Sequence, residues 1–195
     1  MTEEITPIEN VEEEVSLEQF SVNGSLSSFT VRLSGLIVFL ALMAVATLFI
    51  FDLTTSMDII SDIRITIPLV ILMYFVKVLF QYLALLGFAG IGKSQIRLGF
   101  STLNFSPFVH AKRPFELKRF RIYLLLPALC LSIIPLIISI ILHNPIVYFC
   151  ATFAMAFCIS DLISFFRSLT MNGNMLAADH PKLYGFVLYE NPFSN

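Results

Sequence analysis

The chain has 195 residues, of which 57% are hydrophobic and only 13% are charged, and its formal net charge is −2. An ordinary soluble domain carries about 25% charged residues, so this composition, with a mean hydropathy of +0.84, excludes a water-soluble globular protein. Most of the length lies in long apolar runs, which leaves room for one membrane domain and no second folded domain.

The first thirty residues form an acidic segment. They contain seven glutamates and neither lysine nor arginine, and such a composition cannot bury enough apolar surface to order itself. We therefore predict a disordered acidic tail over residues 1–30. An alternative is a short helix through Val11, Val15 and Leu17 that docks against a basic partner or against the basic loop of the chain itself.

Four apolar runs follow, each close to the roughly 20 residues that a helix needs to cross a hydrocarbon core. They cover residues 34–51, 68–88, 122–142 and 146–166. The sequence therefore predicts an all-α integral membrane protein. We expect a bundle of four transmembrane helices within a membrane domain of residues 31–190, with a tail over residues 167–195.

The basic residues indicate the orientation of the chain, because lysine and arginine in short loops stay on the cytoplasmic side. The loop between the first two runs carries Asp52, Asp58 and Asp62 against a single Arg64. The segment between the second and third runs holds seven of the twelve basic residues: Lys93, Arg97, Lys112, Arg113, Lys118, Arg119 and Arg121. We therefore expect that segment, and both termini, to be cytoplasmic.

The same segment contains a strand pattern. Apolar Ile96, Leu98 and Phe100 alternate with the residues between them, and period-two alternation is typical of a strand. Residues 108–111 can return as a second strand, which predicts a small cytoplasmic β-hairpin between the second and third helices. Residues 182–190 also alternate, and predict a further strand that pairs with this hairpin or with an extended segment of a partner.

Residues 115–124 lead from the hairpin into the third run and combine basic with aromatic side chains. This composition suits a helix that lies on anionic lipid headgroups. Membrane lipid is therefore the expected partner of this segment, and we do not expect nucleic acid.

Three polar residues lie inside the apolar runs: Lys77, Gln81 and Asp161. Ionisable groups at membrane depth cost several kcal/mol, so they face the bundle interior and find a partner. Lys77 and Gln81 are one helical turn apart and share a face. We predict a buried pair of Lys77 with Asp161 that fixes the register of two helices, and a proton or ion path through the same pair is the alternative.

These features together resemble a known family. The run KVLFQYLALLGF, the strand pattern, the proline-containing third run, the sequence around Asp161 and the closing AADHPKLYGFVLYE are similar to the bacterial integral-membrane zincin peptidases. That family carries an H-E-x-x-H motif in its second span, in which two histidines bind zinc and the glutamate is the general base, and a later acidic residue as third ligand. Here the motif positions read Phe80, Gln81, Tyr82, Leu83 and Ala84, and only Asp161 matches.

The resemblance therefore implies a degenerate member in the bacterial cytoplasmic membrane, without catalytic residues, metal or cofactor. Its expected function is that of a non-catalytic subunit that binds, escorts or regulates another integral membrane protein. His110, His143 and His180 do not share metal-ligand spacing. Two alternatives remain, an active zinc protease with a rearranged site and a small transport or bacteriocin-immunity protein.

Overall fold

The computed structural model describes residues 22–50, 63–101, 106–180 and 184–190. The acidic segment before Val22 and the acidic loop from Asp52 to Asp62 lie outside the described residues, so the predictions for them stay predictions. Val22 and Asn23 form strand β1, and Ser28 begins a helix, so the predicted disordered tail over 1–30 is wrong from Val22 onwards.

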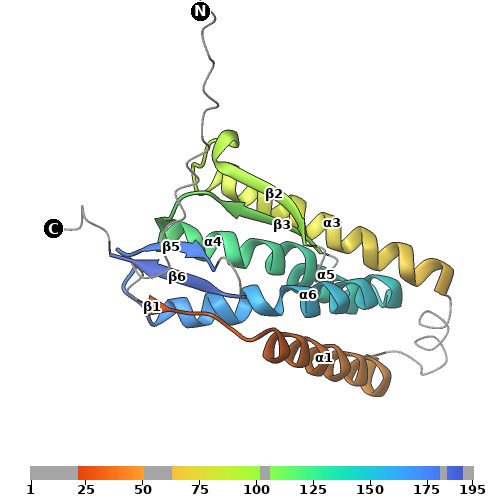
Figure 1. The fold of residues 1–195 in the computed structure, drawn as a ribbon. Coiled ribbons are helices and arrows are strands. Elements are labelled where there is room, and N and C mark those ends of the chain that lie inside the picture. Colours follow the sequence, from red (N-terminus) through yellow and green to blue (C-terminus); the bar gives the residue numbers. More distant parts are fainter. Residues whose placement is uncertain (1–21, 51–62, 102–105, 181–183, 191–195) are drawn as a thin grey trace, which may run out of the picture.

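Helices make up most of the described chain (Figure 1). Their bounds are α1 Ser28–Val45 with a π-helical continuation Ala46–Ile50, α3 Ile63–Gly87, α4 Leu117–Ala128, a π-helical turn η4 Leu129–Ile133, α5 Ile134–Ile141, and α6 Pro145–Leu169. A short 3₁₀ helix, η3, covers Lys93–Gln95. Four stretches are long and apolar enough to cross a membrane: Ser28–Leu48, Ile67–Gly87, Leu117–Ile141 and Pro145–Leu169. The expected four spans of a membrane protein are confirmed at this level.

Local sequence explains where these helices begin and bend. The Ser27 hydroxyl accepts a hydrogen bond from the backbone of Thr30 at the start of α1, and Asn144 caps α6 in the same way. Pro145 follows at the first position of α6, where a missing N–H costs nothing. Pro135 cannot donate to the carbonyl four residues earlier, and the π-helical turn η4 ends two residues before it.

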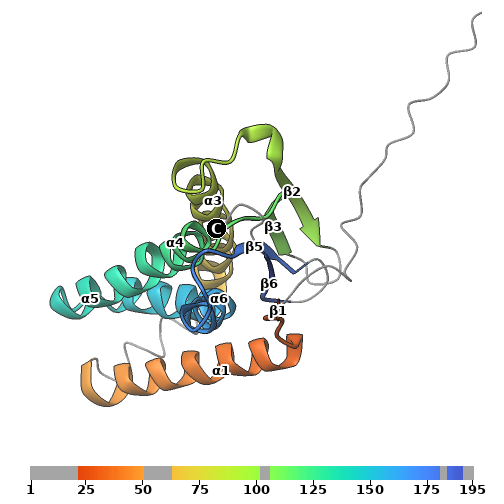
Figure 2. The same cartoon turned by 90° about the vertical axis from the view of Figure 1, so that its left-hand side faces the viewer.

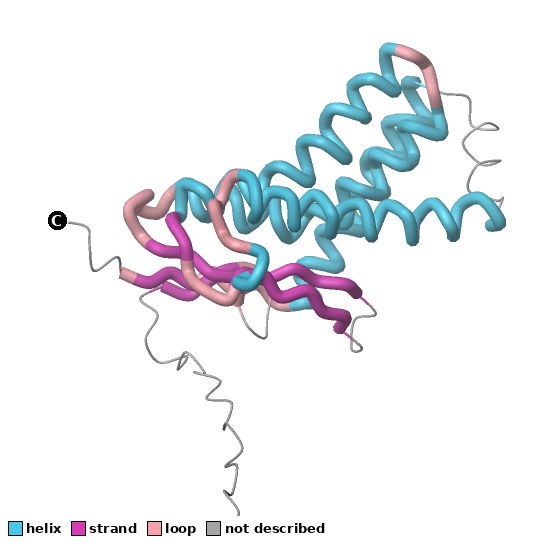
Figure 3. Tube along the Cα trace, turned by 90° about the horizontal axis from the view of Figure 1, so that it is seen from above, coloured by secondary structure: helices cyan, strands magenta, loops and turns pink. Residues whose placement is uncertain are grey.

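The chain is not all-α, because it also contains two small antiparallel sheets. The predicted hairpin is present as β2 Ile96–Ser101 and β3 Ser106–Ala111. A four-stranded sheet has the order β1-β6-β5-β4, with β1 Val22–Asn23, β4 Phe115–Glu116, β5 Leu176–Asp179 and β6 Phe186–Tyr189. Figure 3 shows the strands gathered beside one end of the helices.

The C-terminal strand does not pair as the sequence suggested. β6 lies between β5 and β1, with Val22 opposite Leu188, rather than next to the hairpin. The apolar β6 thereby buries Phe186 and Leu188 completely, in the same core as Phe120 of α4. An edge position on the hairpin would not cover both faces of so apolar a strand.

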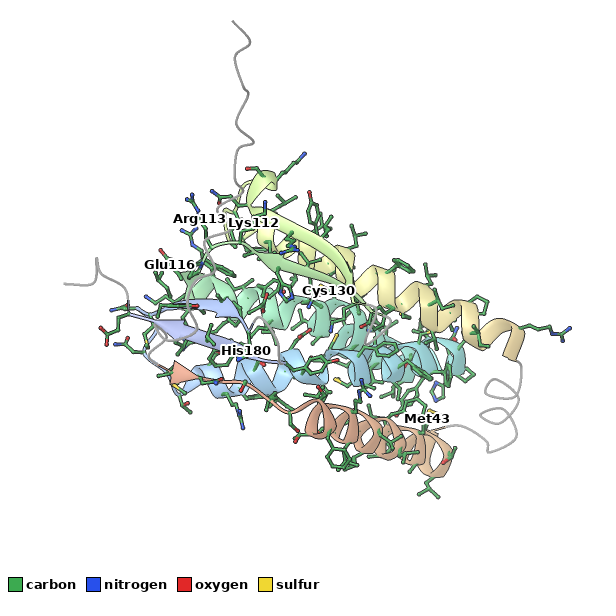
Figure 4. The ribbon with its side chains drawn as sticks, viewed as in Figure 1. Met43, Lys112, Arg113, Glu116, Cys130 and His180 are labelled. Atoms are coloured by element: carbon green, nitrogen blue, oxygen red, sulfur yellow. The ribbon has the colours of Figure 1, made fainter. Side chains whose placement is uncertain are left out.

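The first turns of α4 pack against protein rather than forming a separate helix on the headgroups. Leu117, Phe120 and Tyr123 lie in the hydrophobic core. Arg119 Nη1 donates to Ala89 O just beyond the end of α3, and Arg121 Nη2 donates to two carbonyls at the end of α6. These guanidinium groups satisfy carbonyls that helix ends leave without partners. Lys112, Arg113 and Glu116 lie close together at this end of the molecule (Figure 4).

Helix α6 is the centre of the bundle. It packs against α1, α3, α4 and α5, and Figure 2 shows α1 and α3 on opposite sides of it, with α4 and α5 to one side. The close approach of α1 depends on Gly35, where an added Cβ would lie 3.1 Å from the Ala156 carbonyl oxygen. The outer faces expose large apolar side chains, among them Leu40, Phe75 and Ile141, as expected of helices that meet lipid.

Candidate functional site: a polar cluster between α3 and α6

An ion pair joins α3 to α6 inside the apolar zone. Lys77 Nζ lies 2.9 Å from Asp161 Oδ2, and it donates a second hydrogen bond of 2.8 Å to the Phe157 carbonyl oxygen. Each of the two charged side chains is 13% exposed. The ammonium therefore neutralises the carboxylate and also binds the backbone of the opposite helix, which fixes the register of α3 against α6.

Two neutral groups complete the surroundings of the carboxylate. Gln81 Nε2 donates to Asp161 Oδ2 over 3.2 Å, and Ser160 Oγ donates to Oδ1 over 3.2 Å. Both of these side chains are buried, each 8% exposed. Both carboxylate oxygens thus accept hydrogen bonds, and the cluster of Lys77, Gln81, Ser160 and Asp161 carries no net charge.

Aromatic rings surround one side of this cluster. Tyr74 of α3 meets Phe157 of α6 edge to face, with ring centroids 5.1 Å apart. Phe157 neighbours Phe153 one turn away, and Phe153 lies 4.6 Å from Phe39 of α1. A polar cluster beside apolar rings has a low local dielectric, which strengthens its internal interactions and raises the cost of an unpaired charge.

The donor set at the motif positions does not suit a zinc ion. Phe80 has no lone pair, and Ala84 is fully buried in the hydrophobic core. Gln81, which the resemblance assigns to the position of the general base, is bound to Asp161, and an amide cannot take a proton from water. The acidic residue that the resemblance assigns as third ligand already has an ammonium on its Oδ2 atom. Within the described part of the chain, no three histidine, cysteine, aspartate or glutamate side chains converge as metal ligands.

A second polar cluster lies where strands β3 and β5 meet helix α4. Asp179 Oδ2, at the end of β5, lies 2.9 Å from His110 Nδ1 of β3 and accepts a 3.3 Å hydrogen bond from the Tyr123 hydroxyl of α4. Burial lowers the pKa of His110, the hydrogen bond and charge of Asp179 raise it, and Arg97 lowers it; the net pKa lies above 6.5. Burial alone lowers the pKa of His180. The sequence did not indicate this link, because His110 and Asp179 are 69 residues apart in the chain.

Comparison with known proteins identifies one family. No curated protein and no solved structure matches the chain. The model of a family described as putative zincin peptidase matches residues 70–176, which is more than half of the sequence. The matched region runs from α3 through the hairpin and α6 to the first residue of β5, and it includes Lys77, Gln81 and Asp161. The chain therefore belongs to the putative zincin peptidase family.

Proposed function

We propose that this chain is a non-catalytic member of its family that binds another integral membrane protein. The observation that carries the proposal is the Lys77 ammonium, 2.9 Å from Asp161 Oδ2. A lysine on that oxygen places a positive charge where the family resemblance implies zinc.

The electrostatics favour a lysine that takes the place of the zinc ion over a lysine that shares Asp161 with it. A carboxylate in an apolar zone needs a compensating charge, which a relative would obtain from a divalent cation. Lys77 supplies that charge permanently, and the ammonium repels an incoming cation from the same oxygen. With phenylalanine, glutamine and alanine at the motif positions, neither metal ligands nor a general base remain there.

A binding role fits what the chain retains. The four spanning helices and the extramembrane sheet are built around buried cores, while the spans expose large apolar side chains. In a bilayer, such helices associate with others through close packing and hydrogen bonds between side chains. A scaffold of this kind can hold, escort or regulate a membrane partner without cleaving it.

We place the protein in the bacterial cytoplasmic membrane, with the hairpin, the sheet and both termini on the cytoplasmic side. The support is the seven basic residues between the second and third spans. Lys93, Arg97, Lys112, Arg113 and Lys118 are all exposed at that end.

The test is to crosslink the chain in its native membrane, purify it in mild detergent, and identify what accompanies it. The proposal predicts one membrane protein at near-stoichiometric yield, whose length does not depend on Asp161. A partner that is shortened in the presence of the wild type, and intact with Asp161→Asn, would indicate an active protease instead. Solute flux in proteoliposomes that requires Lys77 and Asp161 would favour the transport alternative.

A further inference from the structure

The face of α6 between α1 and α3 has no helix packed on it within the described residues. In that part of the chain α1 packs against α6 and makes no comparable contact with α3, while α4 and α5 lie to one side of α6 (Figure 2). Phe153, Phe157 and Asp161 follow one another at four-residue intervals, which places them along one face of α6. All three are only partly buried.

Side chains of the flanking helices complete this open face. Phe39 from α1 contacts Phe153, and Tyr74 from α3 contacts Phe157. The Lys77 to Asp161 pair lies next to these rings with 13% of each side chain exposed. Lipid chains offer no hydrogen-bond partners, so exposing part of a charged pair to lipid is unfavourable.

The hydrogen bonds of Lys77 define what this face can accept. An ammonium has three N–H donors, and the structure assigns two of them, to Asp161 Oδ2 and to the Phe157 carbonyl. A ligand with a neutral acceptor can take the third donor without unbalancing the ion pair. A charged ligand would leave a net charge in a low-dielectric region.

We propose that this open face, defined by Phe39, Tyr74, Lys77, Phe157 and Asp161, receives a transmembrane helix of the partner that presents an asparagine or glutamine to Lys77. Serine and threonine fit less well because their hydroxyls bond to their own helix backbone. Asp161 lies eight residues before the end of α6, so the amide is expected roughly 12 Å inside that end. This inference rests on the proposed function, and it specifies which side chain of the partner would contact this chain.

The test uses the purified chain in nanodiscs with two synthetic helices of leucine and alanine, identical except for one asparagine or leucine at the matching depth. A photo-crosslinking amino acid replaces Phe39 on the open face. In a control protein it replaces Leu40, the next residue, which is 56% exposed. We expect the asparagine helix to crosslink about three- to tenfold more than the leucine helix at position 39, with no such preference at position 40.

A second variant, Lys77→Met with Asp161→Leu, removes both charges together and so leaves neither unpaired. We expect it to abolish the preference for asparagine. Equal crosslinking of both helices at position 39, or a preference that survives in the double variant, would overturn the inference. If a native partner co-purifies while the asparagine helix shows no preference, the proposed function stands and only this docking site is wrong.

Discussion

Replacing Lys77 alone should damage the protein more than removing the whole ion pair. In Lys77→Met the alkyl stem is kept, but Asp161 retains only the hydrogen bonds from Gln81 and Ser160. Breaking one partner of a buried pair costs roughly 3 to 5 kcal/mol. Because Asp161 is 13% exposed and keeps two hydrogen bonds, we expect the lower end, about 3 kcal/mol.

The reverse change, Asp161→Leu, leaves the ammonium bound only to the Phe157 carbonyl, and we expect a similar loss of about 3 kcal/mol. The double variant has no charge to bury. Replacing a buried ion pair by an apolar pair of similar volume often leaves stability unchanged. The free energy of unfolding of the double variant should therefore lie within about 1 kcal/mol of the wild-type value.

The assay is the free energy of unfolding in bicelles for the wild type, both single variants and the double variant. Leu72→Met on α3 is the matched control, because the Leu72 side chain is 53% exposed and its replacement should shift the free energy of unfolding by less than about 0.5 kcal/mol. If each single variant is as stable as the double variant, Lys77 and Asp161 are not coupled and the charge-replacement reasoning is refuted.

Two closely packed glycines and the cluster of His110 with Asp179 can be tested in the same way. Gly185 has φ +106°, and an added Cβ would lie 2.5 Å from Gly24 O. Gly185→Ala should therefore lower the free energy of unfolding by about 2 kcal/mol, and an unchanged melting temperature would contradict this. Gly35→Leu should separate α1 from α6 and lower stability by about 2 kcal/mol, whereas crosslinking between α1 and α6 at wild-type yield would argue against it. The pKa of His110 is raised above 6.5, so the protonated imidazole and its ion pair with Asp179 should hold the hairpin most firmly below pH 6.5. His110 should lose its charge, and the hairpin this stabilisation, as the pH rises through the raised pKa. Amide exchange in β3, corrected for intrinsic rates, should then increase, and a pH dependence that persists in Asp179→Asn would exclude this link.

The membrane spans were predictable because an apolar run of about 20 residues has few other structures open to it. A helix was predicted at the start of α4, but its burial was missed, since Lys118 and Arg119 interrupt the hydropathy although Leu117 and Phe120 on the other face are fully buried. A hydropathy window averages over both faces of a helix. The first strand of the hairpin was predictable from its alternation because β2 is six residues long, whereas β3 begins at Ser106, two residues before the predicted start of the second strand.

The four-stranded sheet was not predictable as a unit. β1 and β4 have two residues each, which is too short for a periodic signal. Their partners are remote, as Val22 pairs with Leu188. The link between His110 and Asp179 was not predictable for the same reason, because 69 residues separate the two partners. In contrast, the apolar zone itself indicated that Lys77 needs a partner, because a charge there is costly unless paired.

The zinc content of the purified protein shows whether Lys77 has replaced a metal ion at Asp161. The chain would be purified in detergent, incubated with a slight excess of zinc, desalted and analysed by mass spectrometry for metal per polypeptide. Asp161→Asn would be measured in parallel. If Lys77 has replaced the metal, we expect far less than one zinc per chain, with no difference between the two proteins. Close to one zinc per wild-type chain, lost in Asp161→Asn, would contradict it, because Asp161 would then bind a metal rather than Lys77.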